Sequence, residues 1–507
     1  MELFTDVVFL SRLQFTLTVA FHFVFVPLSI GIGLITAIAA TRAYKSGDPA
    51  DEKASQLWIK IYTTTFAVGV ATGITMEFSF GTNWADYSRF VGDIFGAPLA
   101  AEALFAFFLE SVFLGVLLFG RGKVGRTFYC ASAWLVWAGS CLSALWILIA
   151  NSWMQTPAGA ELAADGSKAV LTDFFAAAFN ATTGVRYFHT VLAALVIGGL
   201  VALSIAAYYQ LKGKHLDFAR KTMKTGLVVS VVATVALFAS AHATAVTVWE
   251  EQPTKLAAME AQYVDEAPPL YFFGWVDEEN QTVIGPNLPG FTSFLATFNF
   301  DTVYPGLNTL AETEQYGDLN VSELPVNAIF QVYHLMVAVS GVLVIILLLT
   351  AIALARKKLQ DWKWLQKLLV ISPIFPFAAI EAGWFTAELG RQPWVVYPAA
   401  SSPDGVSLLT ENAVSTSVSA PELLLTIVLF CAVYLLLFVA WIRLTTKFVK
   451  AGPESASPED GIDVIPSVID KIVGEKEAQV APAVATAAVG KVPAAEALAE
   501  GEGGDVR

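Results

Sequence analysis

Six ionisable side chains lie within stretches of sequence that are apolar enough to cross a membrane. They are His22, Glu102, Glu110, His189, His334 and Glu388. Membrane hydrocarbon strongly disfavours a charged side chain, so an ionisable residue in such a stretch is by default a hypothesis about function. Imidazoles and carboxylates inside one helical bundle could ligate haem iron, transfer protons, or do both.

The composition favours a membrane protein. Hydrophobic residues make up 56% of the 507-residue chain and charged residues 15%, whereas a soluble domain carries roughly 25% charged residues. The formal net charge is −14, and the sequence contains neither a basic patch nor a phosphate-binding glycine loop, so we expect no nucleic-acid partner. The cysteines lie in apolar stretches without disulfide or zinc spacing, which predicts inert buried thiols. They are Cys130, Cys141 and Cys431.

Nine stretches have the length and apolarity of a spanning helix, which needs about 20 such residues. The sequence therefore predicts an all-α, polytopic membrane protein with nine transmembrane helices. The first stretch is too long for a signal peptide and has neither a basic leader nor a cleavage site. The nine stretches run roughly over residues 15–41, 58–79, 95–119, 127–150, 187–210, 223–247, 327–354, 368–388 and 421–445.

Lysine and arginine gather in alternate loops, namely those after the odd-numbered stretches. The positive-inside rule then places the N-terminus outside and the C-terminus in the cytoplasm. We expect four regions along the chain: the first six helices, an external loop, the last three helices and a disordered cytoplasmic tail. Their bounds are 1–247, 248–326, 327–450 and 451–507.

Most of these ionisable residues fall in the outer half of their helices, which favours a redox site at that depth. Met336 follows His334 by two residues and offers a thioether for iron, although methionine also fills gaps in cores. Glu102 and Glu110 are eight residues apart, so they share one helix face and form a plausible proton relay. A pair of protonated structural carboxyls is the alternative. Lys60 begins the second helix at its cytoplasmic side.

Six longer motifs resemble subunit I of cytochrome bd quinol oxidase, and the resemblance extends from about residue 8 to residue 445. They are SRLQFTLTVAFHFVFVPLSIG, GVATGITMEFSFGTNW, VGDIFGAPLAAEALFAFFLES, SALWILIANSWMQTP, QPTKLAAME and EAGWFTAELGRQPW. The resemblance implies a haem-containing subunit of a bacterial cell membrane that oxidises quinol outside and reduces dioxygen to water with cytoplasmic protons. Such an enzyme is a quinol:oxygen oxidoreductase that generates a proton motive force without pumping. It also implies a partner, subunit II, and leaves room for small single-helix subunits.

The resemblance assigns roles residue by residue. His189 and Met336 would bind the low-spin haem b, and His22 and Glu388 would be ligands in the pair formed by high-spin haem b and haem d. Glu102 would lie beside that pair. The quinol-binding positions would be Lys255 and Glu260. Three residues would lie near the haems, namely Trp384, Arg391 and Gln392. Four would form a proton path from the cytoplasm, namely Lys60, Glu110, Ser111 and Ser143.

The chain departs from the family pattern at two places. In YHLMVA, His334 stands where many members have arginine, so it either replaces that cation or competes with Met336 for iron. In AHATAVTVWEEQP, a glycine-bearing motif that opens the quinol loop is eroded. Two other classes compete with the oxidase: a proton-coupled transporter, and a haem-binding assembly or sensor module. Transporters usually show internal repeats and broken helices, and neither is evident in the sequence.

Overall fold

The computed structural model describes residues 4–403 and 405–455, and the predicted tail lies outside them from residue 456 onward. Within this part of the chain, nine helical spans are long and apolar enough to cross a membrane, as predicted. They are Val7–Ser46, Pro49–Gly81, Ala85–Phe119, Arg126–Gln155, Phe174–Lys212, Leu216–Glu251, Val326–Ala355, Lys363–Leu389 and Ala420–Ala451.

Several spans are longer than predicted, because polar residues that we assigned to loops form the terminal turns. The first helix, α1 (Val7–Ser46), begins directly after Asp6, whose carboxylate accepts hydrogen bonds from the backbone N–H groups of Val8 and Phe9. The third span begins at Ala85 rather than 95. Glu102 therefore lies about five turns into its span instead of the predicted two.

Two spans are irregular. The third consists of α3 (Ala85–Ala101), a π-helical turn η2 (Glu102–Phe107) and α4 (Phe108–Phe119). The eighth is interrupted at Ser372 and Pro373, between α13 (Lys363–Ile371) and α14 (Ile374–Leu389). The prediction of unbroken helices was wrong here, because a proline ring excludes a regular helical hydrogen bond. Single π-helical turns are frequent at functional sites.

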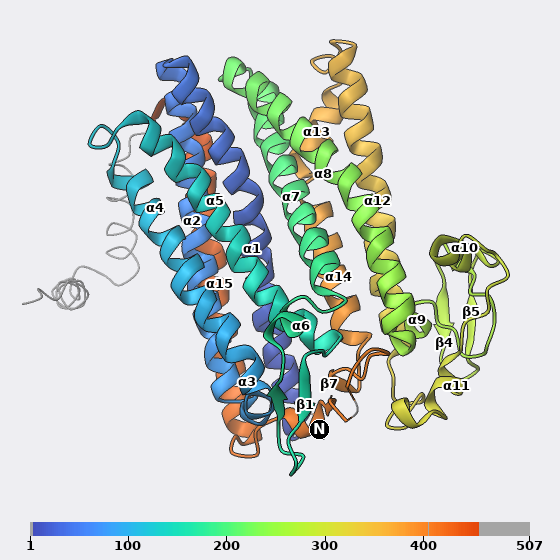
Figure 1. The fold of residues 1–507 in the computed structure, drawn as a ribbon. Coiled ribbons are helices and arrows are strands. Elements are labelled where there is room, and N and C mark those ends of the chain that lie inside the picture. The colour runs from blue at the N-terminus through green and yellow to red at the C-terminus, as the bar shows by residue number, and fades with distance from the viewer. Residues whose placement is uncertain (1–3, 404, 456–507) are drawn as a thin grey trace, which may run out of the picture. The chain divides into compact units, whose positions relative to one another are not determined.

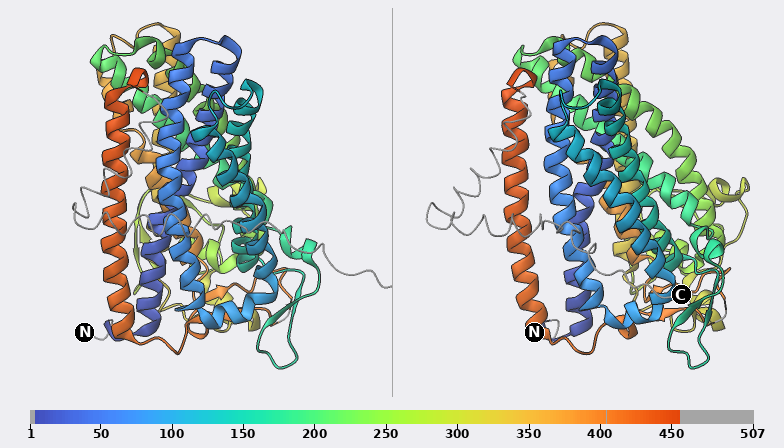
Figure 2. Two further views of the ribbon diagram at one scale, coloured as in Figure 1. Left: turned by 90° about the vertical axis from the view of Figure 1, so that its left-hand side faces the viewer. Right: turned by 60° about the vertical axis from the view of Figure 1, so that its left-hand side comes forward.

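Helix α1 lies at the centre of the bundle and packs against its neighbours on several sides. These are α2 (Pro49–Gly81), α5 (Arg126–Gln155), α7 (Thr183–Lys212) and α15 (Ala420–Ala451), and Figure 2 shows α15 beside α1 and α2. The backbones of α1 and α7 touch, since a Cβ added to Gly198 would lie 2.1 Å from Gly31. Small residues of this kind let membrane helices approach closely.

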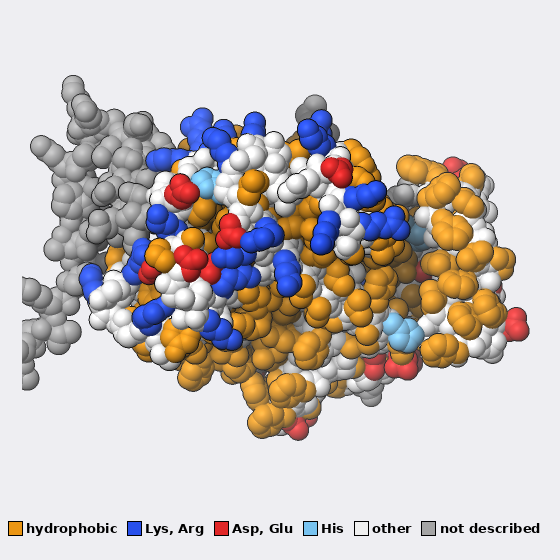
Figure 3. Space-filling view, turned by 90° about the horizontal axis from the view of Figure 1, so that it is seen from above, with side chains coloured by type: hydrophobic (Ala, Val, Ile, Leu, Met, Phe, Trp, Pro, Cys, Tyr) orange, Lys and Arg blue, Asp and Glu red, His pale blue; other side chains and the backbone are white. Residues whose placement is uncertain are grey.

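The bundle has two chemically different ends. One end, here called the basic end, carries the turns that join α1 to α2, α4 to α5, and α7 to α8 (Leu216–Glu251), and lysines and arginines gather on it (Figure 3). The opposite end, the loop end, carries the 248–326 segment and two smaller hairpins (Figure 1). The largest hydrophobic cluster fills the half of the bundle near the basic end.

The loop end holds the short elements. The hairpin β1 (Ala160–Leu162) with β2 (Ala169–Leu171) and helix α6 (Phe174–Ala178) follow α5, and β7 (Trp394–Val396) pairs with β8 (Leu408–Leu409) after α14. The 248–326 segment folds between α8 and α12 (Val326–Ala355) and is ordered over its described length. It contains α9 (Pro253–Met259), β3 (Leu270–Tyr271), β4 (Trp275–Asp277), β5 (Thr282–Ile284), β6 (Asn287–Leu288), α10 (Phe291–Thr297) and α11 (Leu307–Ala311).

Candidate functional site

One cavity of about 1330 Å³ occupies the half of the bundle near the loop end. It is larger than the roughly 300–1,000 Å³ of an ordinary small-molecule pocket. Twelve of the fifteen residues singled out from the sequence line it, while Lys60, Ser111 and His334 lie outside its described lining. The twelve are His22, Glu102, Glu110, Ser143, His189, Lys255, Glu260, Met336, Trp384, Glu388, Arg391 and Gln392.

His22 is held by a hydrogen bond that fixes its tautomer. Its Nδ1 lies 2.8 Å from the hydroxyl of Thr72 on α2, and that hydroxyl lies 3.0 Å from the backbone oxygens of Val68 and Gly69. Because Thr72 donates its single proton to a carbonyl, it accepts one from Nδ1 of His22. The lone pair then resides on Nε2, which is the arrangement of a metal-ligating histidine.

His189 and Met336 line the same cavity from α7 and α12. The Nδ1 of His189 is buried without a hydrogen-bond partner in the described chain. The thioether of Met336 faces Gly383 on α14, where a Cβ would lie only 2.9 Å from the sulfur. Glycine at this position therefore leaves room for the methionine side chain.

His334 does not face the cavity. Its ring stacks on Phe330 with centroids 3.8 Å apart, and its Nδ1 donates a hydrogen bond of 2.8 Å to the Phe330 carbonyl oxygen. The side chain is buried, and its Nε2 has no partner among the residues described. The sequence left two alternatives for His334, replacement of the family's arginine or competition with Met336 for iron, and this orientation, away from the cavity, favours neither.

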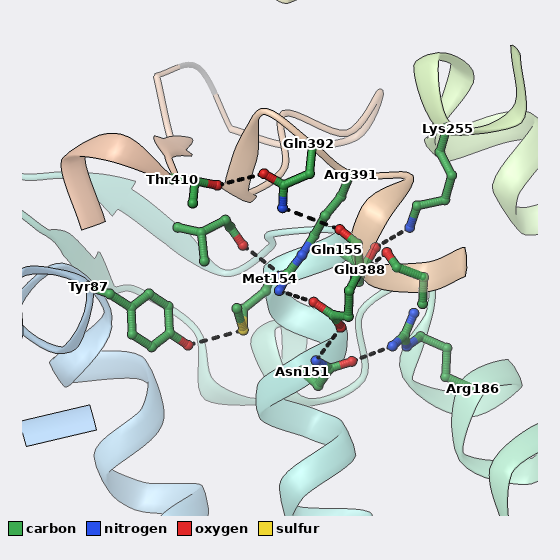
Figure 4. Close-up of polar contacts among 12 residues, drawn as sticks. Tyr87, Asn151, Met154, Gln155, Arg186, Lys255, Glu388, Arg391, Gln392 and Thr410 are labelled. Carbon is green, nitrogen blue, oxygen red and sulfur yellow. Dashed lines mark hydrogen bonds and ion pairs between the residues drawn. The ribbon is translucent and has the colours of Figure 1, made fainter. Parts of the chain in front are cut away.

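Glu388 stands at the centre of a polar network at the end of α14 (Figure 4). It pairs with Arg391 one turn later and accepts a hydrogen bond of 3.2 Å from the amide of Asn151 on α5. The other end of the Asn151 amide accepts from Arg186 on α7. Gln392 donates to the Glu388 backbone oxygen, and Thr410 donates to Gln392 over 3.0 Å. The carboxylate is thus oriented from three separate elements.

Lys255 is part of this network rather than an exposed loop residue. Its ammonium donates to the side-chain oxygens of Gln155, at the end of α5, and Gln252, the latter over 2.9 Å. Lys255 is only 2% exposed. Burial holds the pKa of its ammonium well below its usual range, and the nearby guanidiniums of Arg186 and Arg391 add to that shift.

Glu260 is likewise buried, in a pocket between the 248–326 segment and α12. The hydroxyls of Tyr333 and Thr292 face its carboxyl group, but neither carboxyl oxygen has a partner with full hydrogen-bond geometry in the described chain. Burial raises the pKa of Glu260 to about 8. Such a group can hold or release a proton near neutral pH, which suits proton transfer at a binding site.

The two carboxylates of the third span contact different serines of α5. Glu102, on the π-helical turn, accepts a hydrogen bond of 2.7 Å from Ser143, and Glu110 lies beside Ser140. Ser111 bonds instead to the Phe107 carbonyl oxygen of its own helix. The structure therefore brings Glu102, Glu110 and Ser143 to the cavity and leaves Ser111 outside it.

Some polar residues of this region were missed in the sequence. Arg186 was assigned to a loop, although it precedes His189 by three residues and so lies one helical turn away from it. Asn151, Gln155 and Tyr333 carry no charge and gave no signal. Three further ionisable residues lie in predicted spans, namely Glu77, His242 and Glu381. As ionisable residues in apolar stretches, they are candidates for function on the same ground as the six residues named from the sequence.

The cavity fits haem groups by its donors and by its unpaired polar atoms. Imidazole, thioether and carboxylate are all axial ligands or neighbours of iron, and here they approach from different helices instead of forming one cluster. Three basic side chains surround the single carboxylate Glu388, and the Nε atoms of Arg186 and Arg391 lack partners in the described residues. Guanidinium N–H donors left without a partner suit the anionic propionates of a porphyrin.

The fold and the cavity define a multi-pass membrane protein with the ligand set of a haem protein. A sequence profile of cytochrome bd terminal oxidase subunit I matches residues 10–453, and the chain belongs to this family. It is therefore a subunit of a terminal oxidase in a bacterial cell membrane.

Individual relatives agree with the family. The chain is 33% identical to cytochrome bd-II ubiquinol oxidase subunit 1 of Escherichia coli, over 90% of this chain and 98% of that protein. It is 36% identical to cytochrome bd ubiquinol oxidase subunit 1 of Bacillus subtilis, over 89% and 95% of the two chains. The solved bd oxidase of Geobacillus thermodenitrificans superposes with a TM-score of 0.76 at 27% identity, covering 89% of this chain and 99% of the other.

Proposed function

We propose that this chain oxidises a membrane quinol at the loop end of the bundle and uses the electrons to reduce dioxygen to water. Two quinols yield two quinones, four protons and four electrons, and one dioxygen takes up four electrons and four protons to give two waters. Membership of the bd oxidase family, together with a cavity whose lining contains His22, His189, Met336 and Glu388, is the observation that carries the proposal.

The ligand assignments extend this proposal. His189 and Met336 hold a low-spin haem b, and His22 and Glu388 serve a pair formed by a high-spin haem b and a haem d. When bound, these groups supply the electron transfer and the oxygen chemistry. Arg391 and Arg186 hold Glu388 in place, directly and through Asn151. Trp384 and Gln392 line the same part of the cavity.

The quinol headgroup binds near Glu260 and Lys255. Oxidation releases two protons from the quinol hydroxyls, so a base is needed within hydrogen-bond reach. Glu260 is suited to this role, because burial raises its pKa to about 8 and neither carboxyl oxygen has a partner with full hydrogen-bond geometry among the described residues. Lys255 acts by positioning, since its ammonium is engaged by Gln155 and Gln252.

Protons for water formation enter from the basic end. Lys60 lies about three turns into α2 from that end rather than at its start, with its ammonium 5.7 Å from the ring of Phe448, and Glu110 lies at a similar distance from that end on α4. Glu110 and Glu102 then pass protons toward the cavity. With the N-terminus outside and the C-terminus in the cytoplasm, proton release and uptake occur on opposite sides of the membrane. This sidedness generates a proton motive force without a pump.

The oxidase contains at least one further membrane chain, subunit II, and small single-helix subunits are compatible with the exposed helices. Two measurements on membranes containing the complete oxidase test the proposed function. Reduced-minus-oxidised spectra should show haem b and haem d bands, and added quinol should drive oxygen uptake. A transporter would show no haem bands, and a sensor would show bands without quinol-dependent oxygen uptake; either result would overturn the proposal.

A further inference from the structure

The 248–326 segment carries an apolar surface that the proposed function does not use. Residues 280–300 include no charged residue, and the aromatic side chains at the end of this stretch are exposed, with Phe298 at 74%. Phe272, Phe273 and Trp275 are exposed as well. A water-soluble surface rarely shows so many large apolar side chains together, so this face should contact something apolar.

The position of α10 indicates what that partner is. The segment projects sideways beyond the helical bundle, and the face that it turns toward the basic end is covered by hydrophobic side chains (Figures 1 and 3). A bilayer surrounding the bundle would lie against this face. The acidic residues Asp277, Glu278 and Glu279 lie at the end of β4 and in the turn before β5, and Asp301 directly follows Phe300.

The contact between α10 and α8 sets the depth. The ring of Phe298 lies 6.0 Å from that of His242 on α8. No Asp, Glu, Lys or Arg occurs on α8 from Thr225 to Trp249, so this stretch of 25 residues crosses the hydrocarbon. His242 precedes Trp249 by seven residues, which places it about 10 Å inside that boundary. Phe298 therefore reaches the acyl region of the leaflet at the loop end.

Helix α10 also borders the cavity. The lining of the cavity includes Leu295 and Ala296 of α10 and, opposite them, Ala241 and Ala245 of α8. From this gap the cavity continues to Glu260. The gap between α8 and α10 is thus lined by small and apolar side chains and joins the membrane-facing surface to the buried carboxyl group.

We propose that α10 and the residues following it, through Phe300, lie in the lipid leaflet at the loop end and form one wall of a lateral opening. Quinol enters through this opening from the bilayer, with its isoprenoid tail between α8 and α10. The route to the headgroup site rests on the proposed quinol oxidation, whereas the membrane contact of α10 does not. Phenylalanine carries no polar group and is favourable in membrane hydrocarbon, which agrees with this depth.

Spin labelling tests the membrane contact. In the complete, haem-loaded oxidase, the three cysteines of this chain and any reactive cysteine of its partner chains are replaced by serine, and the protein is labelled at Phe298→Cys or Phe300→Cys in lipid nanodiscs. Both labels should be relaxed more by dissolved oxygen, which concentrates in lipid, than by a water-soluble nickel chelate. A label at Glu279→Cys, on the acidic turn, is the matched control and should show the reverse. Relaxation of both aromatic-site labels by nickel would place this face in water, and shielding from both agents would assign it to a protein partner; either outcome overturns the proposal.

Quinols of different tail length test the opening. Ala296→Phe narrows the gap, and Ala296→Ser is the size-matched control. With a long isoprenoid quinol in proteoliposomes, Ala296→Phe should raise KM several-fold at unchanged kcat, while tetramethylhydroquinone, which has no tail, should show little change. An equal change with both substrates would overturn the lateral route. Absence of oxygen uptake with either quinol in the unmodified oxidase would instead refute the proposed function and leave the labelling result unaffected.

Discussion

Lys255 donates a hydrogen bond to Gln155, so the 248–326 segment is tied to the end of α5 next to the residues that hold Glu388. Lys255 is buried, and its aliphatic stem packs against Gly390, where a Cβ would lie 2.7 Å from Cγ of Lys255. The proposed quinol site and the proposed haem site therefore share one polar network.

Lys255→Met should weaken quinol-driven oxygen uptake and leave the haem bands in place. Methionine preserves the approximate volume but leaves the side-chain oxygen of Gln252 without its donor, at a cost of about 1–3 kcal/mol in stability, whereas Gln155 keeps a hydrogen bond from the Gln252 amide. Alanine is a poor choice because it would also open a cavity. The measurement is KM for quinol alongside the reduced spectrum. An unchanged KM would exclude Lys255 from the quinol site.

Glu260→Gln should remove a pH dependence of quinol oxidation. Because burial raises the pKa of Glu260 to about 8, the carboxyl group is mostly protonated below that pH and cannot accept a proton from quinol. In the unmodified oxidase, kcat/KM for quinol should therefore rise as the pH increases toward 8, as the carboxylate form becomes populated. In Glu260→Gln it should stay low and flat across the same range. A variant that kept the rise would transfer the base to another group.

Met336→Leu should remove or shift the alpha band of the low-spin haem while the fold is retained, because leucine matches methionine in volume but offers no sulfur. His334→Gln is the matched control: His334 lies outside the cavity lining and bonds to the Phe330 carbonyl oxygen. Its band should be unchanged. A shifted band in His334→Gln with an unchanged band in Met336→Leu would exchange the two roles.

Most residues that line the cavity could be predicted from the sequence, but few of the residues that hydrogen-bond to them could. Membrane spans follow from apolar length, and ionisable residues inside them stand out, so His22, Glu388 and their neighbours could be found without coordinates. Asn151 and Gln155 could not, since an uncharged amide near a helix end carries no signal until its partners are placed. The helix ends were misplaced at Ala85 because charged residues such as Asp86 can form turns in the headgroup region. The burial of Lys255 depends on a contact across 100 residues of sequence.

Asn151→Leu should disturb the haems served by Glu388 and spare the low-spin haem. Leucine is similar in size to asparagine but breaks the hydrogen bonds to Glu388 and Arg186 at once. Glu388 keeps its ion pair with Arg391, but the loss of a buried hydrogen-bond partner costs roughly 1–3 kcal/mol, and more where the remaining group is charged. We expect altered high-spin bands and a normal low-spin alpha band. Equal loss of all bands would indicate general unfolding, and Asn151→Asp, which keeps the shape, would then show whether the amide itself matters.

Proton supply through the third span can be tested with two pairs of variants. Glu110→Gln keeps size and hydrogen bonding but cannot exchange a proton, so it should retain haem and bind oxygen, yet slow the steps that take up protons. Glu102→Gln should instead perturb the haem pair, because Glu102 lies on the π-helical turn farther from the basic end.

Ser143→Ala removes the hydrogen bond of 2.7 Å to Glu102 and should slow turnover. Ser111→Ala should not, because the Ser111 hydroxyl bonds only to its own helix. Flash-initiated single-turnover kinetics resolve these phases. Wild-type rates in Glu110→Gln would show that protons take another route and that both carboxyls are structural, and slowing in Ser111→Ala would restore that serine to the path.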